Sequence, residues 1–122
     1  MKTRRFVLWA VTLAVAAGVL AACGGGSAAL EPMNVTIHAK DIAYDITKMT
    51  ATAGQTINVT YINDGALDHT FLIDNVITEQ KITAGATTTF SFTAPDAGTY
   101  TYYCNVAGHK AAGMVGTLTV NP

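Results

Sequence analysis

The sequence predicts an all-β domain, built as a Greek-key β-sandwich of two mostly antiparallel sheets. From Met33 onward the chain consists of short runs rich in Thr, Val, Ile, Tyr and Phe, and many runs alternate apolar and polar residues. Turn-forming residues separate the runs, and no stretch of this part shows a helical period. Runs spaced by roughly ten residues favour a sandwich, with a closed barrel as the alternative.

The chain begins with a predicted lipoprotein signal, residues 1–22. Lys2, Arg4 and Arg5 form a positive start, and the apolar segment FVLWAVTLAVAAGVLAA follows. This segment is somewhat short for a membrane span. It ends in LAAC, which resembles the lipobox of bacterial lipoproteins, where the signal is cut before the cysteine and its thiol is lipidated. Cys23 is therefore the predicted lipid-bearing residue, and an uncleaved helical anchor is the alternative.

Residues 23–32 are predicted to comprise the lipidated cysteine and a flexible tether. The stretch GGGSAAL has the Gly-rich, small-residue composition of a linker. The domain that follows, residues 33–122, is therefore expected outside the cytoplasm. We expect it in the bacterial cell envelope, held to a membrane by the lipid.

The net charge of the chain after residue 22 limits the classes of molecule that it is expected to bind. It carries four lysines, no arginine and eight acidic residues, which is a formal charge of −4. This mildly acidic balance argues against binding to nucleic acid and is compatible with a basic partner.

Six runs of the domain are expected to be strands: residues 33–39, 56–63, 69–75, 87–93, 98–104 and 116–120. Turn signals lie between them, at residues 53–55, 63–66, 84–86 and 94–98. In the run that ends at Cys104, alternation puts Tyr100, Tyr102 and Cys104 on one face. We expect that face to point inward, because an exposed lone thiol is readily oxidised.

Cys104 calls for an explanation. If Cys23 carries a lipid, Cys104 has no cysteine to pair with, although exported proteins usually pair theirs. A bound metal would occupy the thiol, and a buried, inert cysteine is the alternative. His109 and Met114 follow Cys104 at intervals of five residues, in a loop whose only charged residue is Lys110.

These residues, together with His69, predict a metal site. His69 begins a predicted strand after a turn, and a sandwich brings loops from distant parts of the chain together at one end. One thiolate, two imidazoles and a weakly bound thioether are the ligands of blue-copper electron-transfer sites. Zinc would bind the same Cys and His atoms, but it has no redox chemistry and gains little from a methionine. His38, by contrast, is expected to be a surface or edge imidazole.

The loops around the predicted site carry small, mostly uncharged side chains. Gly108 and Gly113 allow tight turns, and Asn105 is expected to hold the loop through local side-chain-to-backbone hydrogen bonds. Five apolar side chains are expected to form a flat docking surface near His109 for a redox partner: Ala66, Leu67, Ala107, Ala111 and Ala112. Ordinary loop residues are the alternative.

The segment TYTYYCNVAGHKAAGMVGTLTV, with GALDHTF upstream, resembles the cupredoxins, and among them the auracyanins. Plastocyanins and azurins are more distant in the same family. The resemblance covers residues 33–122 and implies a sandwich of the cupredoxin type. It also implies one copper ion held by the Nδ1 atoms of His69 and His109 and by Cys104, with Met114 as the axial ligand.

The resemblance further implies roles for residues beside the ligands. It makes His109 the more exposed ligand and the exit for electrons. Thr70 stands where many cupredoxins have an asparagine that braces the two ligand loops, and its hydroxyl can still bond across. Tyr103, an outward neighbour of Cys104, matches a second docking surface of plastocyanins, and a plain surface tyrosine is the alternative.

These features predict a mobile one-electron carrier with a single type 1 copper, and no enzymatic activity because protein atoms fill all four ligand positions. The resemblance implies a quinol-oxidising membrane complex as donor, and a cytochrome, a photosynthetic reaction centre or an oxidase as acceptor. A monomer is expected. The alternatives are a copper-binding or delivery lipoprotein, which often carries Met or His clusters that this chain lacks, and a metal-free structural lipoprotein.

Overall fold

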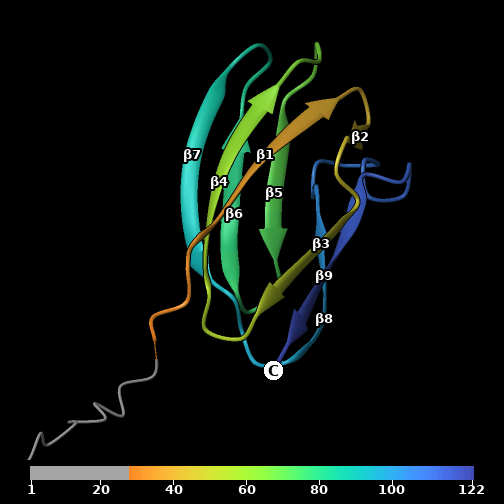
Figure 1. Ribbon diagram of the computed structural model, residues 1–122. Helices are drawn as coiled ribbons and strands as arrows, with labels where there is room; N and C mark the ends of the chain where they lie inside the picture. Colours follow the sequence, from red (N-terminus) through yellow and green to blue (C-terminus); the bar gives the residue numbers. More distant parts are fainter. Residues whose placement is uncertain (1–27) are drawn as a thin grey trace, which may run out of the picture.

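Two β-sheets face each other in the computed structural model, which describes residues 28–122 (Figure 1). The four-stranded sheet has the order β2-β1-β4-β7, with β1 (Met33–Lys40), β2 (Ala43–Tyr44), β4 (Thr56–Asn63) and β7 (Thr87–Thr93). The five-stranded sheet has the order β3-β9-β8-β5-β6, with β3 (Lys48–Thr52), β5 (His69–Ile73), β6 (Ile77–Ile82), β8 (Gly98–Tyr103) and β9 (Val115–Asn121). The predicted all-β sandwich is confirmed, and the two sheets stay separate instead of closing into a barrel.

All six expected strands are present, and three further strands, β2, β3 and β6, were not expected. Each of the three lies at the edge of its sheet. β2 has two residues and β3 has five, and the middle of β6 (ITEQKI) is polar. An edge strand needs little apolar surface, and charged residues there discourage pairing with other chains. Such strands therefore carry a weak sequence pattern.

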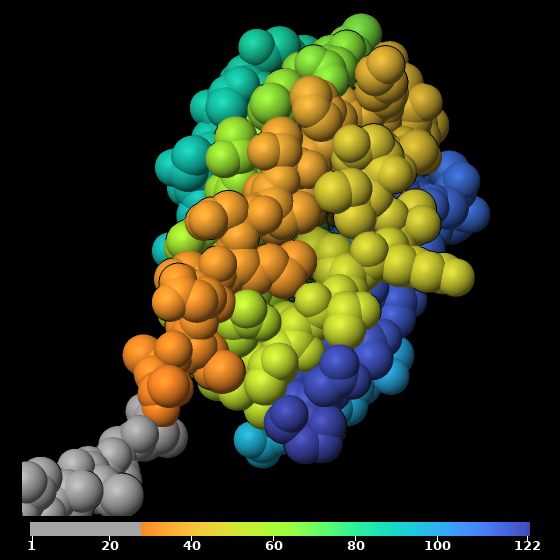
Figure 2. Space-filling view, in the orientation of Figure 1, coloured from red at the N-terminus to blue at the C-terminus, as the bar shows by residue number. Residues whose placement is uncertain are grey.

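Most strand pairs are antiparallel, as expected, but β1 with β4 and β3 with β9 are parallel. The chain leaves the four-stranded sheet after β2 and enters the five-stranded sheet as β3. In the space-filling view, the yellow residues after β1 lie between the orange residues of β1 and the blue C-terminal residues (Figure 2). This segment therefore joins the two layers on that face of the molecule.

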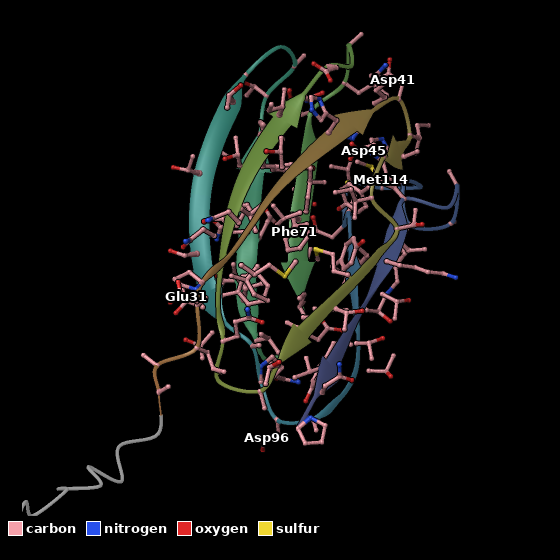
Figure 3. All side chains as sticks on the ribbon, in the orientation of Figure 1. Glu31, Asp41, Asp45, Phe71, Asp96 and Met114 are labelled. Atoms are coloured by element: carbon pink, nitrogen blue, oxygen red, sulfur yellow. The ribbon has the colours of Figure 1, made fainter. Side chains whose placement is uncertain are left out.

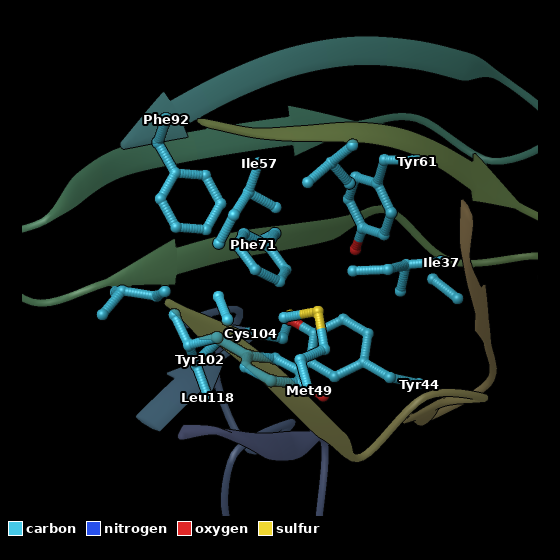
Figure 4. Packing of buried hydrophobic residues seen from close by; sticks show 14 of the residues in the cluster. Ile37, Tyr44, Met49, Ile57, Tyr61, Phe71, Phe92, Tyr102, Cys104 and Leu118 are labelled. Carbon is cyan, nitrogen blue, oxygen red and sulfur yellow. The ribbon is translucent and has the colours of Figure 1, made fainter. Parts of the chain in front are cut away.

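The core consists of side chains that alternate inward from both sheets. Along β4, for example, Ile57, Val59 and Tyr61 are buried while the residues between them are at least partly exposed. Phe71 and Tyr102 meet them from the other sheet and stack on each other, with ring centroids 5.1 Å apart (Figure 4). Cys104 belongs to the same buried cluster as these aromatic rings and is fully buried, as predicted.

Three buried tyrosines each place their hydroxyl on a backbone carbonyl. Tyr44 and Tyr61 both donate to the carbonyl oxygen of Thr70, at 2.6 and 3.2 Å. Tyr102 donates to the carbonyl oxygen of Ile46 at 2.6 Å. Burial raises the pKa of all three phenols, because the charged form loses its hydration.

The topology gathers loops at one end of the sandwich. β4 and β8 end there, and β5 and β9 begin there (Figure 1). Figure 3 shows Asp41, Asp45 and Met114 toward that end, whereas Asp96 lies at the opposite one. The predicted signal (residues 1–22), Cys23 and residues 24–27 of the tether lie outside the described residues. No helix among residues 28–122 is long and apolar enough to cross a membrane.

Candidate metal centre

Three predicted ligands converge at the end where the loops gather. His69 opens β5, Cys104 follows β8, and His109 lies in the loop before β9. One donor atom from each can be chosen so that all three lie within 4.8 Å of one another, and all three residues are buried. The Nδ1 atoms of the two histidines are 3.2 Å apart, and the Nδ1 of His109 is 3.5 Å from the Cys104 Sγ. The predicted use of Nδ1 by both rings agrees with this arrangement.

Backbone hydrogen bonds bring Met114 to the same end of the sandwich as the other three predicted ligands. The Cys104 N–H donates to the carbonyl oxygen of Met114 at 3.1 Å, so the first and last residues of the loop lie side by side. The Met114 N–H donates to the His109 carbonyl oxygen at 3.0 Å. The Met114 side chain is fully buried. The even spacing of Cys, His and Met thus corresponds to one loop folded back on itself.

Two glycines make this loop compact. Gly108 and Gly113 have φ angles of +84° and +103°, in the left-handed region that residues with a Cβ seldom adopt. Hydrogen bonds from His109 N–H to the Val106 carbonyl oxygen and from Ala112 N–H to the Gly108 carbonyl oxygen, both 2.9 Å, close successive turns. The tight turns predicted from these glycines are confirmed.

Thr70 joins the two ligand segments, as its hydroxyl was expected to allow. Its backbone N–H donates to the Cys104 Sγ at 3.4 Å, and its hydroxyl lies 3.5 Å from the same sulfur. The hydroxyl also accepts the Asn105 N–H at 2.9 Å and donates to the Asn105 side-chain oxygen at 2.8 Å. The local role expected for Asn105 was wrong. Its side chain bonds across to Thr70 and to Glu79 (2.7 Å), because β5 and β6 run beside it.

The electrostatics around His69 suit a neutral imidazole ligand. Burial lowers the pKa of His69, and the neighbouring His109 lowers it further, whereas Asp41 and Asp68 act in the opposite direction. A neutral ring keeps a lone pair free for a metal. One thiol, two imidazoles and a buried thioether form a soft, nitrogen-and-sulfur donor set that fits copper.

The residues of the predicted docking surface are exposed. They flank the two histidines, in the turn before His69 and on both sides of His109: Ala66, Leu67, Ala107, Ala111 and Ala112. Leu67 is one of two large hydrophobic side chains among residues 28–122 that are strongly exposed, at 44%. His109 retains 7% exposure and His69 none, so His109 is the more exposed ring, as expected. Docking itself stays a prediction.

Tyr103 and His38 have partners that the sequence did not reveal. The Tyr103 hydroxyl donates to Asp74 at 2.7 Å, and the Lys110 ammonium lies 3.7 Å from the centre of its ring. These contacts hold Tyr103 at the surface, and its role as a second docking surface stays a prediction. His38 is a partly exposed imidazole, as expected, and its Nδ1 lies 2.5 Å from the Asp64 carboxylate.

Asp41 was not among the predicted site residues, yet it lies against the site. Its carboxylate oxygen Oδ1 is 3.7 Å from the Nε2 of His69. Tyr44 and Tyr61 were also missed, although both bond to the residue that braces Cys104. No local pattern marks these residues, because Asp41 and Tyr44 reach partners more than 25 residues away and Tyr61 reaches its partner across the core, from the other sheet.

Known proteins resemble this chain over nearly its whole length. A family model described as a cupredoxin-like domain matches residues 7–120. Auracyanin-A of Chloroflexus aurantiacus is 32% identical in an alignment that covers 98% of both chains. Its solved structure, titled a "blue" copper protein, superposes with a TM-score of 0.68 at 28% identity, over 75% of this chain and all of that one. The dithionite-reduced auracyanin of the photosynthetic bacterium Roseiflexus castenholzii gives the same TM-score and identity, over 80% of this chain and all of that one.

Proposed function

Since this chain belongs to the family of cupredoxin-like domains, we propose that it is a mobile one-electron carrier with a single type 1 copper. The observation that carries the proposal is the convergence of His69, Cys104 and His109, three buried side chains from two separate segments. Their donor types match those of a blue-copper site. A related protein is described as a "blue" copper protein, which supports the same metal here.

His69, Cys104 and His109 would hold the metal, with Met114 as a weak axial ligand. Bound copper would supply the one-electron couple between Cu(II) and Cu(I). The protein would keep the ligands in place for both states. Thr70 fixes the thiol from one side, and the turns of the 104–114 loop fix the two other ligands of that loop.

The exposed apolar residues around His109 would serve electron transfer to and from redox partners. His109 is the ligand ring nearest to solvent, and the apolar residues beside it would allow close approach and quick release. Because protein atoms fill the ligand positions, the site offers no open position for a substrate, which supports a carrier and not an enzyme. A copper-delivery protein would use the same atoms, but it would exchange its metal readily.

The setting of this carrier is also a proposal. The LAAC sequence at residues 20–23 supports a lipid anchor in the bacterial cell envelope, and the domain would work outside the cytoplasm. We propose a quinol-oxidising membrane complex as the electron donor. A cytochrome, a photosynthetic reaction centre or an oxidase would be the acceptor.

The first test is the visible spectrum of the full-length protein after one equivalent of Cu(II). We expect an intense blue thiolate-to-copper band that bleaches with reductant and returns with oxidant. Cys104→Ser is the control and should give no blue band, because serine supplies no thiolate. The absence of a band in the unmodified protein would exclude the carrier. A copper that passes quickly to a chelator would favour delivery.

Replacing Met114 by glutamine is expected to lower the reduction potential while copper stays bound. An oxygen donor favours Cu(II) more than a thioether does. A redox titration of the blue band measures the effect. Met33→Gln, in β1, is the matched control and should leave the potential unchanged. A higher potential for Met114→Gln would contradict an axial role for Met114.

A further inference from the structure

One nitrogen of the metal centre lacks a partner. The Nε2 atom of His69 is buried and has no hydrogen bond to any of residues 28–122. Unpaired buried polar atoms are rare in folded proteins because they forfeit the hydration that they had in the unfolded chain. This atom therefore needs an explanation.

Metal binding by His69 would make a hydrogen-bond partner for this nitrogen more important. The Nδ1 of His69 points toward His109 and would be the metal-binding atom under the proposed function, on which this inference rests. A neutral imidazole that gives its Nδ1 lone pair to a metal carries its hydrogen on Nε2. The buried Nε2 is then a hydrogen-bond donor. Histidine ligands almost always donate that hydrogen to a carboxylate, a backbone carbonyl or water.

Asp41 is the acceptor in reach. Its Oδ1 lies 3.7 Å from the Nε2, so an approach of under about 1 Å would form a hydrogen bond. Asp68 precedes His69 in the chain, but its carboxylate accepts the Ala84 N–H at 3.2 Å and faces Lys81 at 3.5 Å. Asp41 is thus the carboxylate that the structure places beside this nitrogen.

The Asp41 carboxylate is also held in position. The backbone N–H groups of Ala66 and Leu67 donate to it at 3.1–3.3 Å. Gly65 leaves the space that it occupies, since a Cβ at this residue would overlap the Asp41 Oδ1. Asn63 fixes the same turn, accepting the Gly65 N–H at 2.9 Å and donating to the Leu67 carbonyl oxygen at 2.7 Å. The turn formed by residues 63–67 thus holds the Asp41 carboxylate through its backbone N–H groups.

We propose that Asp41 is a positioning residue for the metal centre: its carboxylate accepts the Nε2–H of His69 and holds the ring with Nδ1 toward the metal. A fixed negative charge behind a ligand also stabilises the more positive state of the centre. Asp41 therefore favours Cu(II) and lowers the reduction potential. It also ties the loop after β1 to the ligand at the start of β5.

The test compares Asp41→Asn, Asp41→Ala and Asp64→Asn in the full-length protein loaded with copper. Asparagine keeps an oxygen for the Ala66 and Leu67 N–H groups but removes the charge. Asp64→Asn removes a charge in the same turn region without touching His69, since the Asp64 carboxylate contacts His38. The readouts are the blue band, the reduction potential, the affinity for Cu(II) and hydrogen exchange at the His69 Nε2–H by NMR of the reduced form.

We expect all variants to keep the blue band and Asp41→Asn to shift the potential upward more than Asp64→Asn does. Asp41→Ala should weaken Cu(II) binding about 10–100-fold, the usual cost of losing such a partner, and speed exchange of the Nε2 hydrogen. Equal potentials for the unmodified protein and Asp41→Asn would overturn the assignment. Equal shifts for Asp41→Asn and Asp64→Asn would do the same. A missing blue band in the unmodified protein would instead refute the carrier function.

Discussion

Gly116→Ala is expected to lower the melting temperature of the domain by more than about 10 °C. Gly116 lies on β9 directly opposite Tyr102 on β8, and a Cβ there would overlap the phenol ring. The ring cannot move aside, because it is fully buried, stacks on Phe71 and donates its hydroxyl to the Ile46 carbonyl oxygen. Overpacking and a lost buried hydrogen bond together cost about 3 kcal/mol.

Thermal unfolding of the metal-free protein measures this effect, with Gly98→Ala as the matched control. Gly98 is also a strand glycine, but a Cβ there would meet only ordinary contacts of 3.5–3.7 Å with Tyr100. Its melting temperature should change little. In the double variant Gly116→Ala/Tyr102→Leu, the loss should be smaller than the sum of the two single losses. Equal melting temperatures for Gly116→Ala and Gly98→Ala would show that the Tyr102 ring yields at little cost.

The second large effect is a loss of stability in alkali, of about 4 kcal/mol between pH 9 and pH 11. Burial raises the pKa of Tyr44, Tyr61 and Tyr102 above the ordinary value of 10.0. Above pH 10 the unfolded chain therefore releases three protons that the folded protein keeps. Because the unfolded state then binds fewer protons, the free energy of unfolding falls as the pH rises. Below about pH 9 the tyrosines are protonated in both states and their contribution to stability is complete.

Denaturant unfolding at a series of pH values tests this expectation. The slope of the free energy of unfolding against pH should approach about 1.4 kcal/mol per pH unit for each tyrosine. Tyr102→Phe is the comparison variant, and its slope should be smaller by the share of one proton. A free energy of unfolding that stays constant from pH 9 to pH 11 would mean that water reaches these hydroxyls in the folded protein.

The tyrosines also connect the core to the metal centre. Tyr44 and Tyr61 donate to the carbonyl oxygen of Thr70, and the N–H of the same residue donates to the Cys104 sulfur. The packing of two core rings thus sets the position of the residue that holds the thiol. For this reason we expect the blue band of the copper-loaded protein to disappear in the same alkaline transition that unfolds the core.

The ligands could be predicted from the sequence because three of them share one loop. Cys104, His109 and Met114 have donor types that select copper, and their spacing allows one loop to turn back on itself. His69 was predictable because a strand that begins after a turn places its first residue at an end of the sandwich. The core strands were predictable too, since residues buried on one face alternate along the chain, as in β4.

The sequence by itself therefore determined the fold class, the central strands and the chemistry of the site. Only the tertiary structure decided the edge strands β2, β3 and β6, the two parallel pairs, and the groups behind the ligands. The physical reason is the range of the interactions. Burial of one face of a strand appears in the sequence as alternation with a period of two residues. Ligands that share one loop appear in it at a fixed spacing. The contact of Asp41 with His69 and the hydrogen bonds of Tyr44 and Thr70 with their partners join segments more than 25 residues apart. Such contacts leave no local pattern and exist only once the sheets have paired.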